Sequence, residues 1–491
     1  MSQHQLIIID AMSRVRAEDY NLLVTIGYDD TLVEGVPCKI YLPVKVLDPV
    51  VVHLYPSQEQ AQAILKGCPL FSIVGTEFGP HNVPFAEVVI RKALRTDVQH
   101  DYKAESRIDY LVMVDPMDLK VTDYLPASSS TASTAKGSFK LTPLGHLTPW
   151  KSPVLSDTEV EQTKIIRQIS VRLPNDVDLS FDTRERRREN EDQETVIFTE
   201  LVANFQFDGE DNEGIKINET LGYLDDYLLL ASFAARKRCM CLSWEAWAEK
   251  TFTRFYRKRY VPSSFRRGEQ EDWLINMFLF KEFMDVAYSN FIKVDRQNLL
   301  RRAINYTLPL PQDNRTIEGS FVTLYSALET IVLHFRRNQN LETILPKDEW
   351  KEIDEDLHRW LKTHEKLKAR NDVRQLIYEK LPELNRVSFS SAFKNFCTHY
   401  GVDLRDLWDV VGRTRGVPLS GIRNKLVHGD DFSHDQYGAL IAATDHLRWT
   451  VERMLLAVLG WDPARSEVSV DKLSSQIAGR EDWQQERQKL I

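Results

Sequence analysis

The sequence predicts an α+β multidomain protein in which a β-rich N-terminal region, of sandwich or barrel type, precedes an all-helical C-terminal bundle. Short β-branched and aromatic runs, separated by proline and glycine, recur through the first third of the chain and are typical of antiparallel sheets. From about residue 313 to residue 461, apolar residues instead recur at helical spacing. The 491 residues exceed one ordinary hydrophobic core, so more than one domain is expected.

We expect the first domain to span residues 1–210. Its predicted strands cover residues 22–26, 39–42, 50–55, 71–74, 87–90, 108–114, about 165–173 and about 195–207. Residues 127–138 (ASSSTASTAKGS) are small and polar, which predicts an exposed loop or linker. The charged stretch 182–194 is expected to be another excursion from the sheet.

Residues 211–312 are predicted to form a mixed, mainly helical connector. Within it, residues 239–244 alternate like a strand, which would place Cys239 and Cys241 on the same face. A metal site would need two more ligands and the sequence offers no obvious pair, so buried thiols are the better interpretation. Residues 313–465 are predicted to be a helical domain with one-faced apolar helices at 321–335 and 440–458, and residues 466–491 a C-terminal helix or tail.

Composition restricts the functional classes. No apolar run is long enough to cross a bilayer, no basic region precedes the first apolar stretch, and five scattered cysteines suggest a reducing cytoplasm rather than a disulfide framework. The net charge of −9 argues against a protein that coats nucleic acid nonspecifically, although it leaves room for a local basic site. The cluster Arg254, Arg257, Lys258 and Arg259, interleaved by Tyr256 and Tyr260, is the best accessory nucleic-acid surface.

The most informative segment is Arg423-Asn424-Lys425-Leu426-Val427-His428. It combines a permanent cation with an imidazole, and phosphodiester cleavage needs one group that holds the anion and another that moves a proton. In a helix Asn424 and His428 share a face, whereas Arg423 lies about 140° from His428. The two side chains can converge if the helix ends near His428 or if a second copy of the chain completes the site. The offset makes the shared site the better interpretation without requiring it. The simpler alternatives are a helix-capping histidine and a surface ion pair of Arg423 with Asp430 or Asp431.

These residues resemble the Arg-Asn-x-x-x-His motif of the HEPN superfamily, with Gly429 following. The flanking amphipathic helices, the earlier of which carries Glu329, are similar to those that bracket the motif in HEPN bundles. The order of a β-rich region, a helical middle and a C-terminal HEPN domain resembles the ApeA-like group of prokaryotic defence proteins. The motif-level resemblance covers about 150 residues, and only the architecture of the N-terminal half is similar.

The resemblance implies metal-independent endoribonuclease activity at a homodimer interface, with 2′,3′-cyclic phosphate and 5′-OH products. It makes His428 the general base or acid, Arg423 the group that stabilises the transition state, and Asn424 an orienting or phosphate-binding residue. Lys425, Arg413 and Arg415 would bind flanking phosphates, or each is simple surface. No metal or other cofactor is expected. DNA would fail as a substrate because it has no 2′-OH.

Three functions remain open on the sequence alone. The first is an RNA-cleaving effector of anti-phage abortive infection, with tRNA as one candidate target and a phage-derived trigger sensed by the N-terminal domain. The second is a catalytically silent HEPN module that binds RNA or protein. The third is a carbohydrate or peptide binder with an incidental helical region. The sequence contains no phosphate-loop, GxSxG, HExxH or paired CxxC motif.

Overall fold

The computed structural model describes residues 19–28, 31–42, 50–66, 70–78, 84–103, 107–124, 134–154, 162–189, 195–208, 213–248, 251–257, 272–295, 297–309, 316–412, 417–477 and 483–490. The chain divides into two compact units. The β unit consists of Met1–Ser232 and Arg238–Phe265, and the helical unit of Phe233–Lys237 and Arg266–Ile491. The predicted α+β class is confirmed. The predicted connector 211–312 is divided between the two units.

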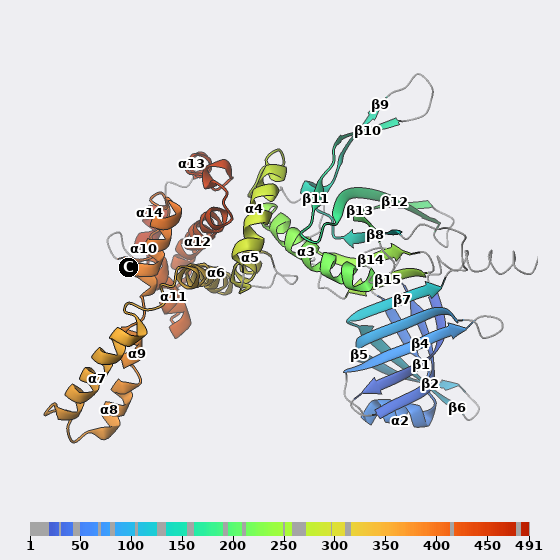
Figure 1. Ribbon diagram of the computed structural model, residues 1–491, viewed down its shortest axis with the longest axis horizontal. Coiled ribbons are helices and arrows are strands. Elements are labelled where there is room, and N and C mark those ends of the chain that lie inside the picture. The colour runs from blue at the N-terminus through green and yellow to red at the C-terminus, as the bar shows by residue number, and fades with distance from the viewer. Residues whose placement is uncertain are drawn as a thin grey trace, which may run out of the picture. The chain divides into compact units, whose positions relative to one another are not determined.

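Six antiparallel strands of the β unit close into a small barrel (Figure 1). In pairing order they are β1 (Asp19–Tyr28), β2 (Thr31–Tyr41), β3 (Val51–Leu54), β6 (Arg107–Pro116), β5 (Pro84–Lys103) and β4 (Leu70–Phe78), which returns to β1. Alternate residues such as Leu22, Val24 and Ile26 are buried in its interior, as the period of two requires. Helix α2 (Gln58–Lys66) adds Ile64 to that core.

Strand β5 is the point at which the barrel continues into an open sheet. Its first part pairs with β7 (Asp118–Tyr124), and its second part pairs with β6. From β7 the sheet continues through β15 (Thr251–Arg257), β14 (Cys241–Trp247), β8 (Thr134–Leu141), β13 (Thr195–Asp208), β12 (Asp178–Glu189) and β11 (Ser170–Arg172). Strands β9 (Trp150–Val154) and β10 (Gln162–Arg167) form a separate pair.

Helix α3 (Glu213–Ala234) packs on one face of this open sheet. Phe181 of β12 stacks on Tyr227 of the helix with 5.5 Å between ring centroids, and Phe139 and Ala203 on neighbouring strands are fully buried on the same face. Burial of these apolar side chains contributes about 25 cal/mol per Å² to stability. Because successive residues of a strand point to opposite sides of the sheet, the residues between them form a second, polar face.

Three predictions about the β region were wrong in detail. Residues 134–138 of the predicted linker belong to strand β8, and the rest of that linker that precedes them lies outside the described residues. The predicted strand at 165–173 is two strands, β10 and β11. Residues 182–189 of the predicted charged excursion continue strand β12, where they pair with β13.

The helical unit is built around α6 (Ile317–Asn338). Thr316 caps it by accepting a hydrogen bond from the Gly319 amide, and its apolar face, including Phe321, Leu328 and Ile331, is fully buried. Helices α5 (Leu299–Thr307), α10 (Phe389–Tyr400), α11 (Leu419–His428) and α12 (Tyr437–Val458) all contact α6. The predicted apolar helices at 321–335 and 440–458 are confirmed as parts of α6 and α12.

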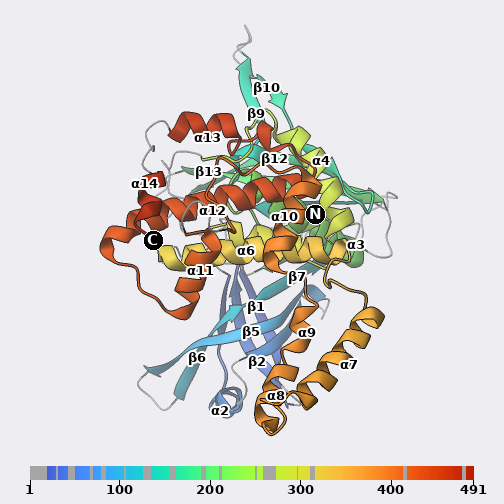
Figure 2. The ribbon, with the colours of Figure 1, turned by 90° about the vertical axis from the view of Figure 1, so that its left-hand side faces the viewer.

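The remaining helices of this unit are α4 (Phe280–Val294), α7 (Lys347–Thr363), α8 (Asn371–Tyr378), α9 (Leu381–Leu384), α13 (Val470–Ile477) and α14 (Trp483–Gln488). Helices α7, α8 and α9 form an arm that extends from the bundle (Figures 1 and 2). The C-terminal segment, predicted as a helix or tail, contains α13 and α14, and its Leu473 and Leu490 are buried. None of the helices in the described ranges is long and apolar enough to span a membrane.

A buried arginine gives the first testable prediction. The Arg453 side chain is 2% exposed and donates to both carboxylate oxygens of Asp406 (2.6 and 2.7 Å), to the Val468 carbonyl (2.6 Å) and to the Asp403 carbonyl (2.9 Å). Arg453→Leu leaves those acceptors without their donor, so we expect a loss of about 2–4 kcal/mol in the free energy of unfolding of the helical unit. Urea unfolding followed by circular dichroism measures it.

The matched control is Arg405→Leu. Arg405 also binds an aspartate, Asp403, at 2.6 Å, but its side chain is 88% exposed. Water solvates such a surface pair in either state, so the urea midpoint should stay at that of the unchanged protein. If the urea midpoints of Arg453→Leu and Arg405→Leu shift equally, burial is not what makes the Arg453 bonds stabilising.

Candidate functional site

Helix α11 carries the motif, and its start is fixed by the segment before it. The backbone amides of Leu419 and Ser420 donate to the carbonyls of Asp409 (2.9 Å) and Val410 (3.0 Å), which satisfies two of the amides that a helix N-terminus leaves open. Leu419 and Ile422 are fully buried. The helix is therefore held by its first turn and its inner face, and the opposite face remains accessible.

The end of α11 is set by Gly429. Its φ of 81° is left-handed, and the amides of Gly429 and Asp430 donate to the carbonyls of Leu426 (3.2 Å) and Lys425 (3.0 Å). This pair of bonds is a Schellman motif, which closes a helix C-terminus. His428 is consequently the last helical residue, at the end where the helix dipole favours a cation.

The side chain of Arg423 extends from α11 toward the middle of α6. Its Nη2 is 3.3 Å from Oε1 of Glu329, its guanidinium carbon is 5.9 Å from the ring centroid of Tyr325, and its Nη1 donates to Oδ1 of Asn424 at 3.3 Å. Tyr325 and Glu329 are four residues apart and share one face of α6. The Arg423 side chain is still 34% exposed, so the guanidinium is oriented without being enclosed. The alternative pairing with Asp430 or Asp431 was wrong, because Glu329 takes that place.

Tyr325 links the site to the core of the bundle. Burial raises the pKa of its phenol above the usual value; the negative charge of Glu329 raises this pKa further, and the positive charge of Arg423 opposes the rise. The phenol therefore stays protonated at neutral pH and cannot act as a base. Its ring provides an apolar wall for the guanidinium. From the sequence, Tyr325 was predicted only as part of the apolar face of the helix at 321–335. Its contact with Arg423 depends on how α11 packs on α6, which the sequence does not show.

Asn424 and His428 are exposed on the outer side of α11. Their separation of four residues puts them on one face, as predicted, with Arg423 turned away from His428. Among the described residues, His428 forms no hydrogen bond or ion pair, so its imidazole is accessible to a ligand. One copy of the chain thus bonds Arg423 to Asn424, whereas His428 shares the face of Asn424, points away from Arg423 and bonds to neither residue.

The predicted phosphate-binding residues have different outcomes. Lys425 donates its ammonium to the Leu490 carbonyl at 3.2 Å, which ties α11 to the C-terminal segment. Arg413 and Arg415 lie outside the described residues.

The prediction of an accessory basic surface was wrong for Arg254 and Arg257. Arg254 is buried and bonded to Asp123 at 2.8 Å, and Arg257 forms a bidentate pair with Asp225 at 3.1 and 2.9 Å. Arg254 is on the buried face of β15, whereas Arg257 is on the opposite face and pairs with Asp225 of α3. In both positions a carboxylate offsets the positive charge. Lys258, Arg259 and Tyr260 lie outside the described residues.

Within the ranges that the structure describes, no group of three or more His, Cys, Asp or Glu side chains could hold a metal ion. Cys239 and Cys241 are buried as free thiols, which confirms the interpretation of these residues as core cysteines. Their Sγ atoms lie 3.3 Å from the Thr142 carbonyl and 3.4 Å from the Ser243 carbonyl.

Comparison with known proteins returned no matching family model, no similar curated protein and no similar solved structure. The functional reading of the site therefore depends on its residues and their geometry.

The helix end gives the second prediction. A β-carbon at Gly429 meets nothing within 4 Å, so the cost of Gly429→Ala comes from its left-handed backbone alone and should be about 1–2 kcal/mol. Gly319→Ala, in the first turn of α6, places its β-carbon at an ordinary 3.5 Å from Thr316 and should instead stabilise by about 0.5 kcal/mol. Thermal unfolding of both variants measures the two signs, and a destabilised Gly319→Ala or an unchanged Gly429→Ala would contradict them.

Proposed function

We propose that the helical unit is a HEPN-type, metal-independent endoribonuclease that cleaves RNA by attack of a ribose 2′-OH on the adjacent phosphate. The observation that carries the proposal is the state of Arg423, which is oriented by Glu329 and Tyr325 and still partly exposed, on the same short helix as an accessible imidazole. A pre-oriented guanidinium stabilises developing negative charge without reorganising during the reaction.

Each motif residue has a separate role in this proposal. His428 removes the 2′-OH proton or protonates the leaving 5′ oxygen, a contribution of typically 10²–10⁴-fold to the rate. Arg423 binds the nonbridging oxygens as their charge increases. Asn424, which accepts a hydrogen bond from Arg423 through Oδ1, retains its NH2 group to donate to a phosphate oxygen.

The cellular role follows from the need to restrain such an enzyme. An unregulated ribonuclease is toxic, so we propose an effector of anti-phage abortive infection in the cytoplasm, restrained or triggered through the β unit. Its expected partners are RNA, with tRNA as one candidate target, a second copy of the chain at the helical unit, and a phage-derived trigger at the β unit. The size of the β unit supports a regulatory role.

A catalytically silent HEPN module that binds RNA or protein is the second candidate. The observation in its favour is the carboxylate of Glu329, which offsets the charge of Arg423 in a chain whose net charge is already −9. In that case the same helix would bind a partner without cleaving it.

Histidine variants test the catalytic role. His428→Ala should abolish growth inhibition and RNA cleavage in an expressing host under an activating stimulus, because no other imidazole is placed on α11. Growth curves and the integrity of total RNA are the measurements.

The matched control is His399→Ala. His399 is also an exposed histidine in the last turn of a helix, and Gly401 ends that helix in the left-handed conformation, as Gly429 ends α11. It therefore shares the helix-end environment without the motif, and should retain full activity. A harmless wild type that leaves RNA intact would favour the silent module, and an equally active His428→Ala would reject the site.

A complementation experiment tests whether two copies share the site. Arg423→Ala and His428→Ala should each be inactive alone, whereas their co-expression should restore up to about half of the activity if Arg423 of one copy works with His428 of the other. Cleavage of total RNA is the readout, with size-exclusion chromatography to verify the dimer. A strictly monomeric active protein, or the absence of any restoration in a mixed dimer, argues for a site within one chain.

A further inference from the structure

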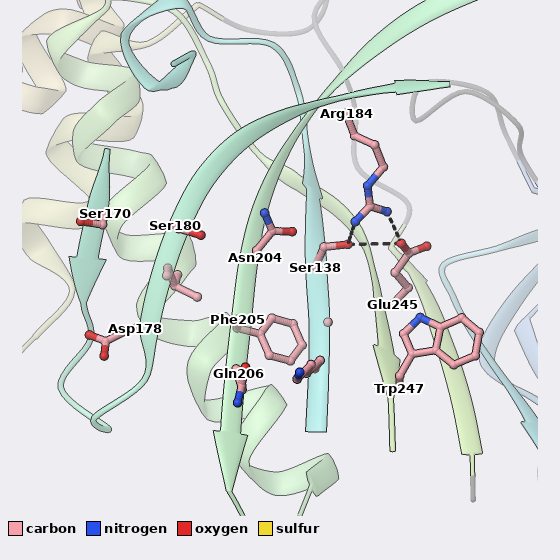
Figure 3. Close-up of a pocket in the computed structure, with 13 residues that line it drawn as sticks. Ser138, Ser170, Asp178, Ser180, Arg184, Asn204, Phe205, Gln206, Glu245 and Trp247 are labelled. Atoms are coloured by element: carbon pink, nitrogen blue, oxygen red, sulfur yellow. Dashed lines mark hydrogen bonds and ion pairs between the residues drawn. The ribbon is translucent and has the colours of Figure 1, made fainter. Parts of the chain in front are cut away.

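The polar face of the open sheet carries a hollow that the proposed nuclease does not use. It lies within the β unit, on strands β11, β12, β13, β8 and β14, and has a volume of about 510 Å³ (Figure 3). Pockets for small molecules commonly have volumes of about 300–1,000 Å³. The hollow is therefore large enough for one small ligand.

Strand register builds the floor of the hollow. Ser180, Asn204, Ser138 and Glu245 are direct cross-strand partners in one row across four strands. A second row places Gln206, Lys136 and Trp247 beside it. Because directly paired residues point to the same side of a sheet, these polar side chains converge on one surface.

The charged groups around the floor largely satisfy one another. The carboxylate of Glu245 accepts from the Arg184 guanidinium and from the Ser138 hydroxyl (3.3 Å), and lies 3.2 Å from the ammonium of Lys140. Arg184 also donates to Ser138 at 3.3 Å. These bonds fix the positions of the four side chains, and they pair both Arg184 and Lys140 with the Glu245 carboxylate.

Uncharged donors and acceptors remain available beside that network. The side chains of Ser180, Asn204 and Gln206 form no hydrogen bond with any other residue that the structure describes. Trp247 stacks on Phe252 with 4.0 Å between ring centroids, yet 43% of its surface is exposed. The hollow thus offers free amides and hydroxyls next to a fixed aromatic ring.

We propose that this hollow binds a neutral, polyhydroxylated ligand, namely a sugar ring. Its lining contains two cations, Lys136 and Arg184, and two carboxylates, Asp178 and Glu245. The further cation Lys140 is buried and already paired with Glu245, so the lining itself has no excess charge to select an anion such as a nucleotide. Amide and hydroxyl side chains match the alternating donors and acceptors of sugar hydroxyls. The exposed indole matches the apolar C–H face of a pyranose. This site is independent of the nuclease proposal.

Ligand-observed NMR on the full chain tests the proposal, with glucose, galactose, mannose and N-acetylglucosamine as neutral probes and AMP as an anionic probe. We expect saturation transfer to at least one neutral sugar, with a Kd on the order of 1 mM. Trp247→Ala should weaken that binding by roughly 5- to 10-fold, and Asn204→Leu should weaken it as well. Melting curves establish that both variants fold.

Trp360→Ala is the matched control, because Trp360 is another exposed tryptophan, 55% accessible, on α7 of the helical unit. Its removal should leave sugar binding unchanged. Binding of none of the four sugars overturns the proposal, as does binding of AMP in their place. Sugar binding that persists unchanged in folded Trp247→Ala and Asn204→Leu also overturns it, because the sugar would then lie elsewhere.

Discussion

The candidate site depends on the packing of one helix face. The apolar side of α6 is buried by α5, α10, α11 and α12, and that packing fixes where the buried Tyr325 and the partly exposed Glu329 meet α11. Arg423 is oriented only because these two residues lie four apart on a helix that the core holds in place. A shift of α6 by one residue would rotate both by about 100° and remove the guanidinium's partners. Core packing and site geometry are therefore one constraint in the helical unit.

In the β unit, the corresponding constraint is the long strand β5. Its two parts have different partners on the same edge, so one sheet closes into a barrel at one end and remains open at the other. The inward face of the barrel is apolar, but where β15 and β7 continue it, Arg254, Asp123 and Tyr20 form a buried hydrogen-bonded cluster. Burial raises the pKa of Asp123, and Arg254 and the Tyr20 hydroxyl oppose that rise. Further along the sheet, the same face is the polar floor of the hollow, to which Asn204 and Glu245 belong.

Local sequence patterns predicted the parts of this structure that local physics determines. The periods of two and of 3.6 located parts of the six barrel strands, β13 and the long helices α6 and α12, but they missed β7, β12 and β15. Gly429, which follows the motif, ends α11 in the left-handed conformation. Local patterns did not predict which strands pair with one another when they lie far apart in the sequence. The small polar composition of residues 134–138 resembles a linker, yet β13 and β14 pair with these residues. Gly137 is needed there because a β-carbon would clash with the Glu245 backbone carbonyl and the Phe205 ring. Similarly, no local signal shows that Glu329 rather than Asp430 binds Arg423.

The electrostatics of Arg423 determine how an RNA could bind at α11. Its partner Glu329 is on the surface, 42% exposed, and a pair of that kind is stabilised by about 0–1 kcal/mol in water. A phosphate can form a bidentate, charge-assisted pair with the same guanidinium, so in the proposed nuclease an RNA phosphate would compete with Glu329 for Arg423 even though the chain as a whole is acidic. Glu329 orients the guanidinium in the free protein, and the proposed exchange would release that guanidinium to phosphate, while the net charge of −9 disfavours nucleic acid elsewhere on the surface. In the proposed nuclease, that exchange would confine RNA binding to α11 and would require no extended basic groove.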